Sequence, residues 1–259
     1  PSGPYTVVDF HYAGGVKNVM KQLESKLHTE APTIYGNTWR ELLETVKGEP
    51  NKVIHSLEDP VAKEPGLKIL RGNISPAGAI VRPTAVYEEV KYIKGAAKVY
   101  ECDQDAYKAI MNGEIVPGDI LVIRYEGCKG APGMKELMLS IDALIGLGLD
   151  KKVGLITDAR FSGFNYGAIV GHVSPEAYDG GVIALIKNGD KIEMDIAGGT
   201  VNLLVSDEEL AERKKSWVRP PLKQQKGVLN IYAQNCRPAE EGGAMQPWAL
   251  DADYGYHHE

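Results

Sequence analysis

The segment DARFSG, residues 158–163, carries the side chains of this chain that are best suited to chemistry. It follows the apolar run VGLIT (153–157), so an acid, a base and a hydroxyl stand at the end of a predicted buried strand. In open α/β sheets, reactive groups gather at the carboxyl ends of strands. Ser162 is therefore a candidate reactive residue, although a serine is a poor base unless a cation or N–H donors lower its pKa. The alternative is structural, with the acid and the base paired to each other or to neighbouring loops and the Ser-Gly pair forming a plain turn.

A glycine-rich loop, RYEGCKGAPGMKE (124–136), is the second candidate. Its glycines would let the backbone approach a ligand, and the amino terminus of a following helix would offer N–H groups to an anion such as a carboxylate. Lys129 would either complement that anion or be solvated. Glu136 is expected in the first turn of a helix, where it is either a helix-end charge or a ligand of a hard cation such as Mg²⁺. An ordinary tight connection would also explain such a loop.

The third candidate is GHVSPEA (171–177). His172 is either a general base or a structural histidine beside a strand. Ser174, followed by a proline, reads as a helix N-cap with Pro at the first helical position, and we assign it to structure.

Elements that would position these loops follow from the apolar pattern. Residues 1–66 form a helical segment and linker, with helices over 15–27 and 38–46. Residues 67–220 form a β-rich domain, and residues 221–259 form a polar, irregular tail. The expected strands are short segments bounded by turn residues: 68–70, 79–81, 98–102, 119–125, 152–157, 182–187, 191–196 and 200–205.

Turn and cap signals complete this prediction. The Asn-Gly turn within 187–190 predicts that strands 182–187 and 191–196 are antiparallel neighbours. Asp103 is expected to cap a helix to about residue 112, residues 134–147 form a second helix, and Ser206 opens a third that ends at Trp217. The fold class is therefore mixed α/β, a closed or nearly closed β-structure with helices on one side.

Composition excludes several classes of function. The chain has 259 residues and a net charge of −6, which argues against a nucleic-acid-binding protein. Its longest apolar candidate, 137–149, is interrupted by Ser140 and Asp142 and is too short for a membrane span. We find no signal peptide, and the first residues lack an initiator Met, as in a piece cut from a longer chain. Three widely spaced cysteines indicate neither a disulfide framework nor a zinc site, so the expected location is the reducing cytoplasm.

Taken together, the three loops, with GNISPAGA (72–79), closely resemble the carboxyl-terminal half of the dihydroxy-acid dehydratase and 6-phosphogluconate dehydratase family, which includes sugar-acid dehydratases. AGGVKNVM (13–20) is similar to a mid-chain segment of that family, and LVSDEELAER (204–213) to its closing helix. The resemblance covers the chain up to about residue 235. It implies a swivelling β/β/α barrel-like domain.

The resemblance also implies a reaction, the conversion of a 2,3-dihydroxy acid to a 2-keto acid. In such enzymes a [2Fe-2S] or [4Fe-4S] cluster acts as Lewis acid on the departing hydroxyl, and Mg²⁺ holds the substrate carboxylate and C2 hydroxyl. By motif match, Ser162 is the base that removes the C2 proton and Glu136 is a magnesium ligand. We expect Arg160, Gly163 and Lys129 to contact the hydroxy-acid substrate.

Departures from the family pattern limit this carry-over. The cluster cysteines and the other magnesium ligands belong to an amino-terminal half that the chain does not contain, so we expect the chain to need that half as a partner and to be inactive alone. Cys128 and Ala131 stand where relatives usually have Pro and Gly. Phe164 follows the serine motif in place of a small residue and would reshape the pocket. A full-length homodimer or larger oligomer is expected, and the alternative function is a non-catalytic binding or assembly domain.

Overall fold

The computed structural model describes residues 3–63, 65–163 and 165–245, which divide into two compact units with the boundary between residues 64 and 65. The first unit is helical, with α1 (Val7–Tyr12), α2 (Gly15–Gln22) and α3 (Trp39–Glu44). Thr6 and Thr38 each form a reciprocal capping box with the third helical residue, which fixes where α1 and α3 begin. Helix α1 was not predicted, and the helix expected over 15–27 ends at Gln22 and continues as the 3-10 helix η1 (Glu24–Lys26).

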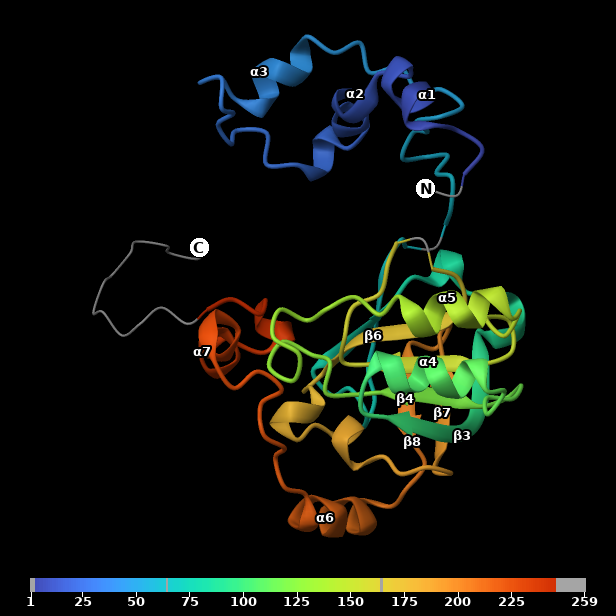
Figure 1. Cartoon of the computed structure of the whole chain (residues 1–259). Helices are drawn as coiled ribbons and strands as arrows, with labels where there is room; N and C mark the ends of the chain where they lie inside the picture. Colours follow the sequence, from blue (N-terminus) through green and yellow to red (C-terminus); the bar gives the residue numbers. More distant parts are fainter. Residues whose placement is uncertain (1–2, 64, 164, 246–259) are drawn as a thin grey trace. The chain divides into compact units, whose positions relative to one another are not determined.

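An eight-stranded mixed sheet dominates the second unit (Figure 1). Its strands are β1 (Lys68–Leu70), β2 (Gly78–Val81), β3 (Tyr92–Tyr100), β4 (Ile120–Ile123), β5 (Gly154–Thr157), β6 (Ala168–Ser174), β7 (Lys191–Asp195) and β8 (Thr200–Leu203). The order is β1-β2-β6-β5-β4-β3-β7-β8, and a bridge between Arg71 and Thr200 joins the two edge strands. The sheet is thus a nearly closed barrel, which confirms the predicted mixed α/β fold.

Alternation along the central strands divides the core in two. In β4, Ile120 and Val122 belong to the cluster inside the barrel, whereas Leu121 and Ile123 belong to a second cluster on the outer face. Helices α4 (Asp103–Met111) and α5 (Leu139–Gly146) supply the other side of this second cluster (Figure 1). Strands β3 to β6 run parallel to one another, so their carboxyl ends lie at the same end of the barrel.

The strand expected over 182–187 was wrong. Val182–Leu185 is a 3-10 helix (η5), and its buried residues fill the barrel interior. A short apolar run fits a buried helical turn as well as a strand, so periodicity alone does not separate them. The turn at 187–190 exists, but β7 pairs with β3 and β8 instead of with residues 182–187. Strand β6 was missed from the sequence.

Helix starts also differ from the prediction. Cys102, not Asp103, is the N-cap residue of α4, and the Asp103 carboxylate accepts the backbone N–H groups of Leu139 and Ser140 at 3.2 and 3.1 Å. Asp103 therefore caps α5, which begins at Leu139 and not at residue 134. Ser206 caps α6 (Asp207–Ser216) as predicted.

The tail and one serine need correction too. The tail contains an unpredicted helix, α7 (Gly227–Asn235). Ser174 ends β6 and caps no helix, and the 3-10 helix η4 (Ala177–Asp179) has Glu176 at its N-cap. In the part of the chain that the structure describes, no helix has both the length and the apolar character that a membrane crossing requires. Residues 246–259 of the predicted tail lie outside the described ranges.

Candidate active site

Three loops meet at the carboxyl ends of the parallel strands. Two of them are loops that the sequence singled out, whereas the third candidate, 171–177, lies mostly in β6 and enters the third loop only at its last residues. We call the three loops the glycine-rich loop (124–138, after β4), the serine loop (158–167, after β5) and the third loop (175–181, after β6). Parallel strands deliver successive loops to the same end of a sheet, which is where open α/β folds place their sites. The barrel therefore brings together segments that are far apart in sequence, from residue 124 to residue 181.

The glycine-rich loop and the serine loop are joined directly through their backbones. Glu136 and Arg160 form a parallel β-bridge, in which the N–H of Leu137 donates to the carbonyl of Arg160 at 2.9 Å. Glu136 was expected in a helical turn, and this was wrong because α5 begins only at Leu139 and Met134 adopts a positive φ of 53°. The extended backbone, not a helix end, positions Glu136.

The Glu136 side chain is half-buried, and its carboxylate has no hydrogen bond or ion pair with another described residue. A carboxylate whose partners are not supplied by the fold is available to a ligand. Bridged residues lie about 4.8 Å apart. Two further residues of chain span at most about 7 Å, so the Cα atoms of Glu136 and Ser162 are within about 12 Å of each other.

Ser162 is half-buried, and its backbone N–H donates to the side-chain oxygen of Asn165 at 2.7 Å. The preceding Phe161 holds the loop against β6, where a Cβ on Gly171 would approach the Phe161 ring to 2.6 Å. Gly163 is exposed and has open space around it, the nearest atom to a Cβ being a nitrogen of Arg82 at 3.9 Å. Phe164, which was expected to reshape the pocket, lies outside the described residues.

Arg160 is exposed, and its Nε donates to the carbonyl of Met134 at 2.6 Å, a second tie between the serine loop and the glycine-rich loop. Burial, together with the charge of Arg160, lowers the pKa of His172. The imidazole is therefore neutral near pH 7. The backbone of His172 has a positive φ of 54°, and its backbone N–H donates to the carbonyl of Ala159 at 2.9 Å.

Lys129 faces the third loop. Its ammonium pairs with Asp179 at 2.6 Å, and its backbone N–H donates to both carboxylate oxygens of Glu176, at 2.8 and 3.2 Å. Lys129 is thus engaged with protein carboxylates, and a substrate anion would have to compete with Asp179 for its charge.

Three buried carboxylates behind the loops were not identified as site residues from the sequence: Glu126, Asp158 and Glu176. Asp158 is fully buried and accepts N–H groups from the other two loops. Glu126 contacts the ammonium groups of Lys135 and Lys223 at 3.2 and 3.3 Å through one oxygen, and its other oxygen is buried without a hydrogen-bond partner. The sequence signal for Asp158 was an acid directly after a buried strand.

Burial raises the pKa of Asp158 to about 6 and that of Glu176 to about 8. In each case desolvation is the largest cause, and a nearby carboxylate adds to it: Glu126 for Asp158 and Asp158 for Glu176. At neutral pH this cluster therefore holds at least one proton among its members.

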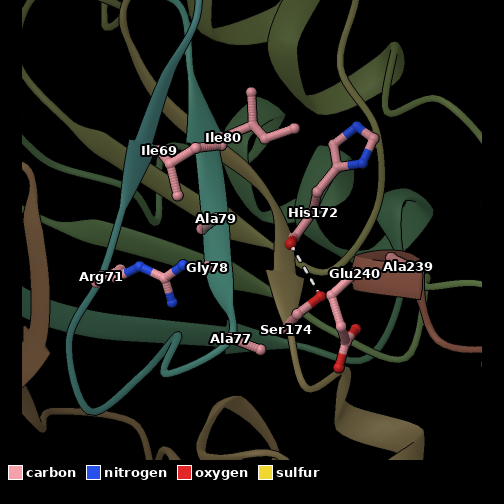
Figure 2. Close-up of a pocket in the computed structure, with 10 residues that line it drawn as sticks. All are labelled: Ile69, Arg71, Ala77, Gly78, Ala79, Ile80, His172, Ser174, Ala239 and Glu240. Carbon is pink, nitrogen blue, oxygen red and sulfur yellow. Dashed lines mark hydrogen bonds between the residues drawn. The ribbon is translucent and has the colours of Figure 1, made fainter. Parts of the chain in front are cut away.

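Two hollows lie in the second unit, and one of them borders the glycine-rich loop. One of about 300 Å³ lies between β1, β2, β6 and the 3-10 helix η6 (Ala239–Glu241), and Figure 2 shows His172 and Ser174 on one side of it and Arg71 on the other. Another of about 420 Å³ is lined by the glycine-rich loop and the tail, with Glu126, Lys135 and Lys223 among its residues. His172 lines the first hollow, but the residues that the family resemblance implies for the site line neither: Ser162, Glu136, Arg160, Gly163 and Lys129.

The described residues do not by themselves build a metal or cluster site. Within residues 3–245, leaving out 64 and 164, no three His, Cys, Asp or Glu side chains are grouped so that they could hold a metal ion. Glu136 offers one carboxylate, which fits a magnesium ion that takes its other ligands from substrate, water or another part of the enzyme. Cys128 and Cys236 pack together beside Met134, but among the described residues they belong to no group of three side chains that could hold a metal ion.

Comparisons with known proteins agree on one family. Residues 52–243 match the family model described as "Dihydroxy-acid/6-phosphogluconate dehydratase C-terminal", and residues 1–42 match the corresponding amino-terminal model. The chain is 44% identical over 248 residues to a dihydroxy-acid dehydratase of Caldanaerobacter subterraneus, covering 95% of this chain and 45% of that protein. It is 45% identical over 249 residues to one of Methanosarcina barkeri, covering the same shares of the two chains. A Geobacter relative of the same name is 45% identical over 242 residues, 93% of this chain and 44% of its own length. The chain therefore spans less than half the length of the curated relatives that it matches.

Proposed function

Since this chain belongs to the dihydroxy-acid/6-phosphogluconate dehydratase family, we propose that it is the catalytic carboxyl-terminal portion of a hydro-lyase that converts a 2,3-dihydroxy acid to a 2-keto acid. The substrate class is a branched-chain precursor or a sugar acid. The portion of the relatives that this chain lacks would supply the remaining groups of the active site.

The Glu136–Arg160 bridge is the observation that carries this proposal. It holds the serine loop and the glycine-rich loop side by side, so that the Cα atoms of Glu136 and Ser162 lie within about 12 Å of each other. A dehydration that begins with loss of a proton next to a carboxylate needs these two functions close together, one to bind a cation and one to take the proton.

Each residue of the candidate site would have its own role in the dehydration. Mg²⁺ and an iron–sulfur cluster, when bound, would polarise the substrate and activate its C3 hydroxyl as a leaving group. Glu136 would hold the magnesium ion. Ser162 would accept the C2 proton through its Oγ as the C3 hydroxyl departs, and the resulting enol becomes the 2-keto acid. Arg160 and Gly163 lie on the same loop as Ser162 and would orient the substrate, and Lys129 would act from the glycine-rich loop.

A dehydration assay tests the proposal. A panel of branched-chain dihydroxy acids and sugar acids would be incubated anaerobically with this chain alone, and with the chain joined to an amino-terminal half that carries a loaded cluster. Keto acid formed only with the amino-terminal half supports a catalytic portion and identifies the substrate class. No product from any acid, with a loaded cluster and stably associated halves, would contradict the proposal and favour the assembly function.

A further inference from the structure

The Asp158 carboxylate sits at the junction of the three site loops. One oxygen accepts the N–H of Glu126 at 3.0 Å, and the other accepts those of Tyr125 and Ala177 at 3.1 and 2.9 Å. Residues 125 and 126 open the glycine-rich loop, Asp158 opens the serine loop, and Ala177 belongs to the third loop. One side chain thus fixes where three separate loops start.

Glu176, in the third loop, makes a similar contact with the glycine-rich loop. It is buried, and its carboxylate receives the N–H of Lys129 from the middle of the glycine-rich loop. Gly127 makes the approach possible, since a Cβ at that position would lie 1.8 Å from a Glu176 oxygen. The glycine-rich loop is therefore tied to the other loops both at its start and at its middle.

These ties are costly as purely structural contacts. A fully buried carboxylate loses its hydration, and apolar packing is often at least as stabilising as buried charge. Several N–H donors on one carboxylate do, however, fix direction and distance more tightly than apolar contacts, which are not directional. The buried carboxylates therefore cost stability through desolvation, but they fix the relative positions of the loops at the site.

We propose that Asp158 and Glu176 are positioning residues, which hold the loops bearing Glu136, Ser162 and Lys129 in the relative arrangement that turnover requires. This inference rests on the proposed dehydratase function for its catalytic part. Neither residue needs to touch the substrate.

The first test uses amide hydrogen exchange on the 259-residue chain, which requires no activity. Asp158→Asn keeps the size of the side chain but places an NH₂ group opposite at least one N–H donor. We expect the amides of Tyr125, Glu126 and Ala177 to exchange at least about tenfold faster in this variant. Asp119→Asn is the matched control, because Asp119 is a buried acid that accepts the N–H of Val116 at the opposite end of β4.

The second test uses the full-length enzyme. Displacements of about 1 Å cost on the order of 10²-fold in rate, so we expect kcat of Asp158→Asn to fall by about that factor, with a smaller change in KM. Asp119→Asn should retain kcat. At position 176, Glu176→Met removes the acceptor and should lower kcat by about tenfold, whereas Glu176→Gln keeps an acceptor oxygen and should retain most of it.

Several outcomes would overturn the inference. They are unchanged exchange at the three amides, full kcat in a folded Asp158→Asn enzyme, or equal kcat for the Met and Gln variants at position 176. If Asp158→Asn does not fold, the Met and Gln pair decides alone. Absence of dehydratase activity in the full-length wild-type enzyme would contradict the proposed function. The hydrogen-exchange result would still decide whether Asp158 holds the loops.

Discussion

Ser162 and Glu136 are common side-chain types, and the Glu136–Arg160 bridge places them on adjacent loops. A serine hydroxyl does not remove a proton from carbon at neutral pH unless a positive charge lowers its pKa. Glu136, whose carboxylate has no partner among the described residues, is the group through which a cation would reach that hydroxyl. In the proposed reaction, the roles of both residues depend on a metal ion, which one carboxylate alone would hold weakly.

Glu136→Gln tests this dependence at the residue scale. The amide has a similar shape but carries no charge, so in the full-length enzyme we expect the Mg²⁺ concentration for half-maximal activity to rise by at least about tenfold. A magnesium titration of activity measures this directly.

The matched control is Glu212→Gln, which removes a surface carboxylate that pairs with Lys215 on α6. It should leave the magnesium titration unchanged. Equal magnesium dependence for Glu136→Gln and wild type would mean that Glu136 is not a ligand.

At the scale of elements, the sequence was informative where local signals are strong. Alternating or apolar runs between turn residues located seven of the eight strands, and Ser206 marked the start of α6.

Prediction from the sequence failed where long-range contacts decide the structure. Asp103 was expected to cap its own helix but caps α5, a partner 36 positions away that no local pattern reveals. The same contact starts α5 late and leaves Glu136 in extended backbone. For the candidate site, motifs predicted the residues on the loops, and these stay predictions, whereas the buried carboxylates behind the loops were not predicted.

Two glycines, one on β6 beneath the serine loop and one within the loop, give an element-scale prediction. A Cβ at Gly171 would lie 2.6 Å from the Phe161 ring and 3.1 Å from the Ala159 carbonyl, so Gly171→Ala should displace the loop. Overpacking of this kind costs about 1–3 kcal/mol, and thermal unfolding should show a fall in Tm of several degrees.

Gly163→Ala is the comparison, since its Cβ would meet nothing closer than 3.9 Å. Its Tm should match wild type. If both variants unfold at the wild-type temperature, the packing of Phe161 on β6 does not hold the serine loop.

At the scale of the whole molecule, buried acidic side chains lie at the end of the barrel that bears the site loops. Glu176 has a pKa raised by burial to about 8, so the folded state binds its proton more tightly than the unfolded state, where the pKa is about 4.5. The stability from this proton is fully present below pH 4.5 and is lost as the pH rises toward 8. Asp158 acts in the same direction between its unfolded value of 3.8 and about 6. The barrel should thus be less stable in mild alkali than in mild acid.

Glu176→Gln isolates this effect between pH 6.5 and pH 8, where Asp158 is already charged. The variant should already unfold with a higher free energy than wild type at pH 6.5, because wild type loses stability from pH 4.5 upward, and this advantage should be larger at pH 8. The difference should grow by up to about 1.4 kcal/mol per pH unit. Urea unfolding at each pH measures it, and a constant difference across the range would show that Glu176 does not take up a proton on folding.

The most direct measurement of the central claim is turnover of a 2,3-dihydroxy acid by the full-length enzyme carrying Ser162→Ala, beside one carrying Ser174→Ala. Ser174 lies on β6, and its hydroxyl donates to the carbonyl of His172 at 3.3 Å. The account predicts that Ser162→Ala abolishes turnover with folding and cluster content intact, and that Ser174→Ala retains it. Turnover retained by Ser162→Ala would contradict the assignment of the base, and with it the catalytic role given to this chain.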